Sequence, residues 1–175
     1  IHGLMGDYAK ASSMATFMES HSDRHSTELA MLAGARMVSA AETECDRKWD
    51  EAKVKSITGG DPVTARFMRC DNFTYIPKMK LLLVGNHPPK LTSADESMRR
   101  RLRMIPFTAV PEVKDKALMD ALRPEWPGIL EWAIQGCLAR QKDGLGACGR
   151  MEEATSEYFE EEDVFGQWIS ECLDR

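Results

Sequence analysis

Two short apolar runs stand out in a chain that otherwise mixes polar and hydrophobic positions. Met37–Ala41 and Leu81–Val84 have the length and continuity that are typical of buried parallel strands. A polar residue follows each run, because Glu42 comes directly after the first and Asn86 comes two residues after the second. A third short strand is predicted at Met104–Phe107. Since ligands of open α/β sheets bind at the carboxyl ends of the strands, these polar positions are candidates for chemistry.

A different pattern lies between the two apolar runs. Apolar and polar residues alternate from Val63 to Met68, and aromatic residues resume at Phe73 and Tyr75 after the polar stretch Arg69–Asn72. Period-two alternation around a polar tip predicts a two-stranded β-ribbon. A simple sheet edge is the plain alternative for this segment.

Helices are predicted on both sides of the first apolar run. Ser26–Ala33 has a serine suited to the N-cap, and Gly34 ends it. Thr43–Ile57 is rich in helix-forming residues and stops at the turn sequence Thr58–Pro62, because glycine tolerates positive φ and proline halts a helix. Residues 1–25 have no firm period and are expected to be loop with at most one helix.

The C-terminal part of the chain is predicted to be helical. Three helices are expected, over residues 115–122, 127–140 and 152–173, and Pro127 suits the first turn of the second of them. The aliphatic and tryptophan residues of the second helix are more typical of a core than of a ligand site. The expected organisation is therefore an α/β domain over residues 1–108 and a helical subdomain over residues 109–175.

Composition and charge narrow the class. The 175 residues are 43% hydrophobic and 29% charged, with a net charge of −5, which suits one globular domain with a real core. No apolar run approaches the roughly 20 residues that a bilayer requires. Five cysteines without a C-x-x-C pair imply neither a disulfide framework nor a zinc ribbon, so a reducing, cytosolic setting fits. The histidine pair His21 and His25 has the spacing of two metal ligands but lacks a third.

The charge is distributed unevenly along the chain. From Thr64 to Arg103 there are nine basic and three acidic residues, whereas from Met151 onward nine acidic residues face Arg175 alone. A basic middle beside an acidic end predicts a molecule that meets a polyanion with one side.

Several short motifs then follow one another in an order that resembles the helicase domain of phage and plasmid DNA primase/helicases, which belong to helicase superfamily 3. The resemblance runs from about Gly6 to the end. Its motifs are Leu29-Ala-x-Leu-x-Gly34-x-Arg36, the strand into Glu42-Thr-Glu44, Lys55-x-x-Thr-Gly-Gly-Asp-Pro-x-Thr-Ala-Arg66, Phe73 with Pro77, the strand into Asn86-His-Pro-Pro89, Arg100-Arg-x-Arg-x-Ile-Pro-Phe107 and Gly128-Ile-Leu-x-Trp132.

The resemblance implies an α/β fold with an AAA+-like P-loop NTPase core, an inserted β-hairpin and a C-terminal helical subdomain. It also implies a homo-oligomer, expected to be a hexameric ring around single-stranded or forked DNA, with ATP and Mg²⁺ bound between subunits. A fused or associated primase is the further partner it allows for, and the cytoplasm, that of a bacterial host if a phage or plasmid encodes the protein, is the expected location.

The resemblance implies that two acids and an amide are catalytic residues. Glu42 ends the Walker B strand and is the candidate for holding Mg²⁺ through water, and Glu44 is a second acid close by. Hydrolysis needs one carboxylate for the metal and one for the attacking water. Since Thr43 separates the two acids, which of them has which role stays open. Asn86 matches motif C, whose polar group can hydrogen-bond the γ-phosphate or the lytic water.

Basic residues complete the implied site. Arg100 stands where these proteins carry an arginine finger that reaches the ATP of the neighbouring subunit, although the other arginines of residues 99–103 compete with it. Lys55 and Arg101 are the candidates for further nucleotide contacts. On the ribbon, Arg66 and Arg69 are the candidates for gripping the DNA backbone, although the acid in the tip makes it less positive than a dedicated clamp.

One motif of this class is missing. The sequence has no G-x-x-x-x-G-K-[ST] loop, whose amides and lysine cradle the phosphates. We therefore expect a core truncated after that loop, which does not hydrolyse ATP alone but belongs to a replicative, ATP-dependent DNA helicase. The alternatives are an AAA+ ATPase that acts on protein and a non-catalytic nucleic-acid-binding or assembly module.

Overall fold

The computed structural model describes residues 1–20, 26–41 and 47–173. Contacts between residues divide the chain into two compact units. The first unit comprises Ile1–Leu102 together with Glu157–Arg175, and the second comprises Arg103–Ser156. The two domains expected from the sequence, 1–108 and 109–175, stay a prediction.

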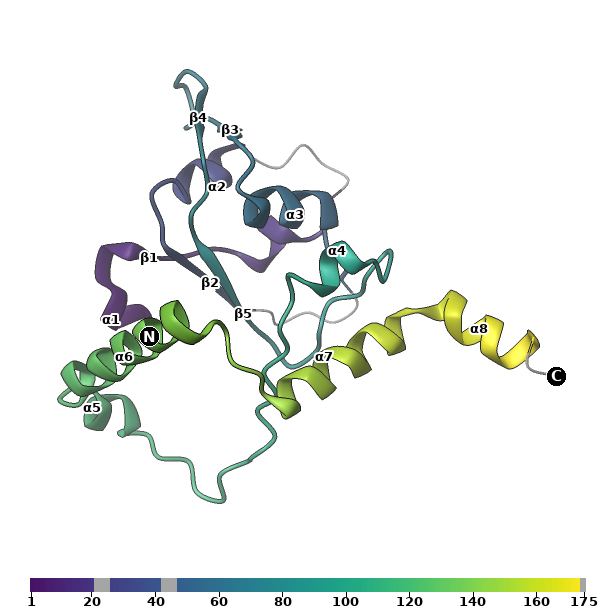
Figure 1. Cartoon of the computed structure of the whole chain (residues 1–175). Coiled ribbons are helices and arrows are strands. Elements are labelled where there is room, and N and C mark those ends of the chain that lie inside the picture. Colours follow the sequence, from purple (N-terminus) through teal and green to yellow (C-terminus); the bar gives the residue numbers. More distant parts are fainter. Residues whose placement is uncertain (21–25, 42–46, 174–175) are drawn as a thin grey trace. The chain divides into compact units, whose positions relative to one another are not determined.

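A three-stranded parallel sheet organises the first unit (Figure 1). Its strands are β1 (Ala9–Ala11), β2 (Met37–Ala41) and β5 (Lys80–Val84), in that order across the sheet. The register of β2 and β5 runs without a break from the pair Met37 and Lys80 to the pair Ala41 and Val84. The two strands predicted from the apolar runs are therefore confirmed, and they are direct neighbours.

The strand β1 was missed because its sequence is only Ala-Lys-Ala, too short and too weakly apolar to give a pattern. It follows two short helical turns, α1 (His2–Met5) and η1 (Gly6–Tyr8), and η2 (Met14–Phe17) comes after it. Buried side chains from several parts of the first unit form its core. Its largest fully buried members are Phe17, Met18, Leu32, Ile57, Met98 and Val38.

Two helices flank β2 in the chain. The helix α2 (Ser26–Met31) ends slightly earlier than predicted, with Gly34 at φ 80° after it. The helix α3 (Glu51–Gly59) begins eight residues later than the predicted start at Thr43. Its N-cap is Asp50, whose carboxylate accepts the Lys53 amide at 3.0 Å.

The late start of α3 has a structural reason. Lys48 and Trp49 form isolated β-bridges, with Lys90 in parallel and with Met18 in antiparallel orientation. The Trp49 amide donates to the Lys90 carbonyl at 3.0 Å, and the Lys90 amide donates to the Arg47 carbonyl at 2.8 Å. Extended backbone is needed for these bonds, so tertiary pairing overrides local helix propensity here.

The predicted ribbon is present as an antiparallel hairpin of β3 (Val63–Ala65) and β4 (Phe73–Tyr75). The register pairs Val63 with Tyr75 and Ala65 with Phe73, and the hydroxyls of Thr64 and Thr74 are hydrogen-bonded at 3.0 Å on the other face. Figure 1 shows the hairpin extending past α2 within the first unit.

The first unit is completed by α4 (Glu96–Arg99), which the sequence pattern did not predict, and by the C-terminal helices. The single acidic helix expected over residues 152–173 is two helices, α7 (Gly149–Glu162) and α8 (Val164–Leu173), which break at Asp163. From the end of α7, Tyr158 and Phe159 enter the core.

Tyr158 connects α7 to the loop after β5. The Trp49 indole donates to the Tyr158 hydroxyl at 3.1 Å, and that hydroxyl donates to the Pro89 carbonyl. Burial raises the pKa of Tyr158 above its ordinary range, so the hydroxyl stays protonated and able to donate. Nearby, the Leu91 amide donates to the Glu162 carboxylate at 2.7 Å.

The second unit is mostly helical. It contains α5 (Leu118–Leu122), α6 (Trp126–Asp143) and the start of α7, and the Met104 amide donates to the Thr155 hydroxyl at 3.1 Å. The strand predicted at Met104–Phe107 is wrong, because these described residues make no strand pairing and Pro106 lacks the amide that a ladder needs. The helix predicted over residues 127–140 is confirmed as α6, while α5 is shorter than predicted.

Among the residues that the structure describes, no helix is both long and apolar enough to cross a membrane.

Replacing Tyr158 with Phe should lower the free energy of unfolding by about 1–3 kcal/mol. The ring still fills the core, but the Trp49 indole and the Pro89 carbonyl lose a buried partner. Urea unfolding of the full-length protein measures the change. The control is Tyr8→Phe, since Tyr8 is exposed, and an equal effect of both substitutions would contradict this account.

Candidate functional site

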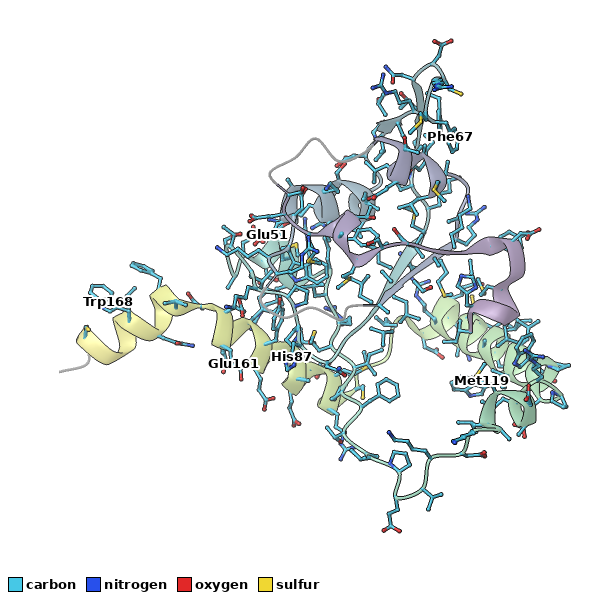
Figure 2. The ribbon with its side chains drawn as sticks, turned by 180° about the vertical axis from the view of Figure 1, so that it is seen from behind. Glu51, Phe67, His87, Met119, Glu161 and Trp168 are labelled. Carbon is cyan, nitrogen blue, oxygen red and sulfur yellow. The ribbon has the colours of Figure 1, made fainter. Side chains whose placement is uncertain are left out.

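The candidate site begins at the carboxyl ends of β2 and β5. Ala41 and Val84, the last residues of these strands, are paired in the register, so the two ends meet at one edge of the sheet. Asn86 is exposed in the bend that follows β5, and its neighbour His87 marks this bend in Figure 2. Glu42 and Glu44 follow Ala41 in the chain, but both lie outside the described residues.

Arg100 and Arg101 follow α4 directly and differ in their surroundings. Arg100 is exposed, whereas Arg101 is half-buried. The Arg101 guanidinium donates from Nη1 to the carbonyl of Ser97 at 2.7 Å and to its hydroxyl at 3.1 Å. The Arg101 Nε atom is buried and has no hydrogen-bond partner among the described residues. Arg101 is therefore held against α4, while Arg100 faces outward.

Arg99, another arginine of this cluster, is turned toward α7. Its guanidinium carbon lies 5.3 Å from the centre of the Phe159 ring, which is a cation–π distance. Of these three arginines, Arg100 has the environment that best suits a group reaching out of its own subunit.

A network of three charged residues connects α3 to the start of α4. Lys55 Nζ lies 2.6 Å from an Asp95 carboxylate oxygen and 3.3 Å from a Glu51 oxygen. Asp95 is also the N-cap of α4 and accepts the Met98 amide at 2.8 Å. We call Glu51, Lys55 and Asp95 the charged clamp, and Glu51 is labelled in Figure 2.

Glu51 extends the clamp to the loop before α4. One of its oxygens accepts the amides of Thr92 at 2.7 Å and Ser93 at 3.0 Å, and the other accepts the Ser93 hydroxyl at 3.1 Å. The loop after β5 and the N-cap residue of α4 are thus both tied to α3. The helix α4 is a single turn, and Arg100 directly follows it. By holding the start of α4, the clamp therefore also sets the position of the Arg100 backbone.

The charges of the clamp reinforce one another. The hydrogen bond with Lys55 lowers the pKa of Asp95, and the same bond with Asp95 raises the pKa of Lys55. Burial acts to raise the pKa of Glu51, but hydrogen bonds from Ser93, Thr92 and Lys55 lower it overall. All three groups are therefore charged at neutral pH.

The clamp changes the interpretation of Lys55. This residue is a candidate nucleotide contact from the sequence, and the structure gives it two carboxylate partners. Sequence reasoning missed both partners, although each left a signal. Glu51 stands four residues before Lys55, the spacing of a helical ion pair, and Asp95 stands three residues before Met98, the spacing of an N-cap.

The two hairpin arginines form a separate feature. Arg66 and Arg69 are exposed, and Arg69 lies in the turn with φ 61°, in the left-handed region. The chain leaves β4 and enters β5 at its amino end, so the hairpin lies at the opposite end of that strand from Asn86 (Figure 1). The structure therefore does not bring Arg66 and Arg69 together with the strand ends.

Within residues 1–20, 26–41 and 47–173 there is no group of three or more His, Cys, Asp or Glu side chains that could hold a metal ion. The expected Mg²⁺ position at Glu42, as well as His21, His25 and Cys45, falls outside these ranges.

The fold is a mixed α/β arrangement with a parallel sheet, compatible with an NTPase-like core. The chain belongs to DUF5906, described as a family of unknown function, which its residues 3–101 match.

Two viral proteins are similar over most of the chain. "Putative helicase L207/L206" of Acanthamoeba polyphaga mimivirus is 28% identical over 193 residues, covering 98% of this chain and 20% of the relative. "Putative helicase 022R" of Frog virus 3 is 28% identical over 169 residues, covering 83% of this chain and 17% of the relative. The chain thus has a distant, helicase-like relationship and spans about a fifth of the length of these relatives.

Replacing Asp95 with Asn tests the clamp, since Asn can still cap α4 but cannot pair with Lys55. The folded pKa of Asp95 is lowered, so its contribution is present above the ordinary pKa and is lost as the pH falls through the folded value. The folded pKa of Lys55 is raised, so its contribution is lost as the pH rises through that value.

We therefore expect Asp95→Asn to lower the free energy of unfolding by at most about 1 kcal/mol between about pH 5 and pH 10, since both side chains are partly exposed. The difference should shrink at more acidic and more alkaline pH. Urea unfolding across pH measures it, with Asp120→Asn on α5 as the control. A difference independent of pH would contradict the ion pair.

Proposed function

We propose that the chain is part of an ATP-dependent replicative DNA helicase of the superfamily 3 type, of phage or plasmid kind, that hydrolyses ATP between the subunits of a ring. The observation that carries this proposal is the pairing of Ala41 with Val84. This pairing aligns β2, which leads into Glu42, with β5, which leads toward Asn86. The similarity to two viral proteins named as helicases supports the same class.

The chemistry of the strand-end residues suits a magnesium nucleotide. Carboxylate and amide oxygens are hard donors of the kind that Mg²⁺ prefers. Glu42 would hold the ion through water, and Glu44 would orient or deprotonate the attacking water, or the two acids would exchange these roles. Asn86 would hydrogen-bond the γ-phosphate or that water. The ion, when bound, offsets the charge of the phosphates.

Arg100 is the arginine that we assign to the neighbouring subunit's nucleotide. It is exposed and directly follows α4, which the charged clamp and the packing of Phe159 hold in place. A side chain that must reach across an interface needs a rigid starting point and an unburied guanidinium. Arg101, whose guanidinium donates a hydrogen bond to the Ser97 carbonyl, would support the nucleotide site from its own subunit.

The hairpin supplies the contact with DNA in this proposal. Arg66 and Arg69 are exposed, and phosphate contacts from such side chains are independent of sequence and sensitive to salt. A ring of subunits would place one hairpin from each subunit along the DNA backbone. Hydrolysis at one end of the sheet would then move the hairpin at the other.

Because the chain alone is not expected to hydrolyse ATP, the test uses the full-length protein, meaning this chain together with the segment that supplies the phosphate-binding loop, in steady-state ATPase assays with and without single-stranded DNA. Glu42→Gln and Arg100→Ala should each lower DNA-stimulated turnover by about 10³-fold or more, because both groups act on the transferring phosphoryl. The control is Arg123→Ala on α5, which should leave turnover unchanged.

Turnover that survives Glu42→Gln or Arg100→Ala would refute the roles assigned to them. An ATPase that ignores single-stranded DNA and survives Arg69→Ala would instead favour a protein substrate.

Salt dependence of DNA binding tests the hairpin. Arg66→Ala and Arg69→Ala should each weaken the binding of single strands of any sequence, and each should reduce the slope of log affinity against log salt by about 0.7. Arg140→Ala on the exposed surface of α6 is the matched control. Fluorescence anisotropy across a salt series measures the slope, and an unchanged slope in both hairpin variants would exclude these arginines as phosphate contacts.

A further inference from the structure

Three aromatic rings form a continuous row along one face of the hairpin. The rings of Phe67 and Phe73 are stacked, with centroids 5.7 Å apart and planes at 20°, and those of Phe73 and Tyr75 are 6.0 Å apart at 31°. The Tyr75 hydroxyl donates to the Leu29 carbonyl of α2 at 2.7 Å. The row is thus anchored at its base, and Phe67, labelled in Figure 2, lies at the outer end of the hairpin.

Burial decreases along this face toward the turn. At the base, Val63 and Ala65 are buried next to Tyr75 and Phe73 in the register. Beyond the last strand pair, Phe67 is 44% exposed and Met68 is 78% exposed. One side of the Phe67 ring is covered by Phe73, so the exposed part is an aromatic surface that the hairpin does not use for its own packing. We call Phe67, Met68 and Arg69 the hairpin tip.

The backbone of Arg69 gives a second, independent observation. Its φ of 61° is one that glycine adopts without steric cost, whereas a residue with a Cβ is sterically disfavoured there. An arginine at this position keeps a positive charge two residues from the exposed ring at a cost in stability. Such strain, when it occurs at an exposed turn, points to a role in binding.

We propose that the hairpin tip stacks the Phe67 ring on an unpaired base of a single-stranded nucleic acid, while Arg69 and Arg66 bind the adjacent phosphates. This inference rests on the proposed function, in which the hairpin contacts DNA. An aromatic face beside basic groups is the combination that binds single strands without sequence preference, because every base has a π-face. In a duplex the bases already stack on one another, so the tip selects the unpaired strand.

Binding by the full-length protein of two single-stranded oligonucleotides of equal length, one normal and one without bases, tests the proposal. Phe67→Ala should weaken binding of the normal strand about ten-fold and leave the base-free strand unchanged, since stacking contributes roughly 1–3 kcal/mol per base. Phe67→Leu, which keeps apolar bulk without a π-face, should behave like Phe67→Ala. Phe67→Trp should retain binding.

A fluorescent 2-aminopurine base in the normal strand gives a direct readout. Its emission should be quenched by the wild type and by Phe67→Trp, and should recover in Phe67→Leu. Unchanged quenching and affinity in Phe67→Leu would overturn the stacking proposal. An equal loss of affinity for the normal and the base-free strand would also overturn it, because that result indicates a structural role for the ring.

Arg69→Ala separates this inference from the function on which it rests. If Arg69→Ala weakens the binding of both strands while the Phe67 variants change the binding of neither, the hairpin binds DNA through phosphates alone and the stacking proposal fails. If the wild type binds neither strand, the proposed function fails as well. If Phe67→Leu instead dissociates an oligomer in sedimentation velocity, the tip is a protein interface and the stacking proposal is wrong.

Discussion

The parallel pairing of β2 with β5 is the constraint on which the rest of the structure depends. Five consecutive residue pairs, ending at Ala41 and Val84, bring the carboxyl ends of the two strands to one edge of the sheet. Two factors set this register: the backbone hydrogen bonds and the burial of Val38 and Ala40. A slip by one residue would turn the core side chains of β2 to the opposite face. The last residues of the two strands therefore lie side by side.

The described part of the candidate site is held by connections between residues 47–59 and the segment that follows β5. The partly exposed ion pair of Lys55 and Asp95 is worth at most about 1 kcal/mol by itself. The buried hydroxyl of Tyr158 joins Trp49 to Pro89, and an unpaired group there would cost about 1–3 kcal/mol. The buried polar contact thus contributes more to stability. The charged clamp has a more local effect, because it sets the position of α4 and so of the arginines that follow.

The sequence predicted the elements whose patterns are local and failed where tertiary contacts decide. Continuous apolar runs identified β2 and β5, and alternation identified the hairpin. The strand β1 has three residues and no pattern, and α4 depends on a cap that Lys55 holds from another helix, so neither could be read locally. The strand expected at Met104–Phe107 was wrong for a related reason, because an apolar run with a proline found no partner to pair with. Of the candidate site, Asn86 is exposed just beyond the end of β5 and Arg100 is exposed after α4, whereas Glu51 and Asp95 emerged only from the structure.

Mixing subunits tests the central claim most directly, namely that the acid at the end of β2 and Arg100 serve one ATP site from two different subunits. Full-length Glu42→Gln and Arg100→Ala proteins would be assayed for ATP hydrolysis separately and then after mixing and reassembly. The account predicts that each is inactive alone and that the mixture regains turnover, because some interfaces then combine an intact acid with an intact arginine. A mixture no more active than its components would contradict it.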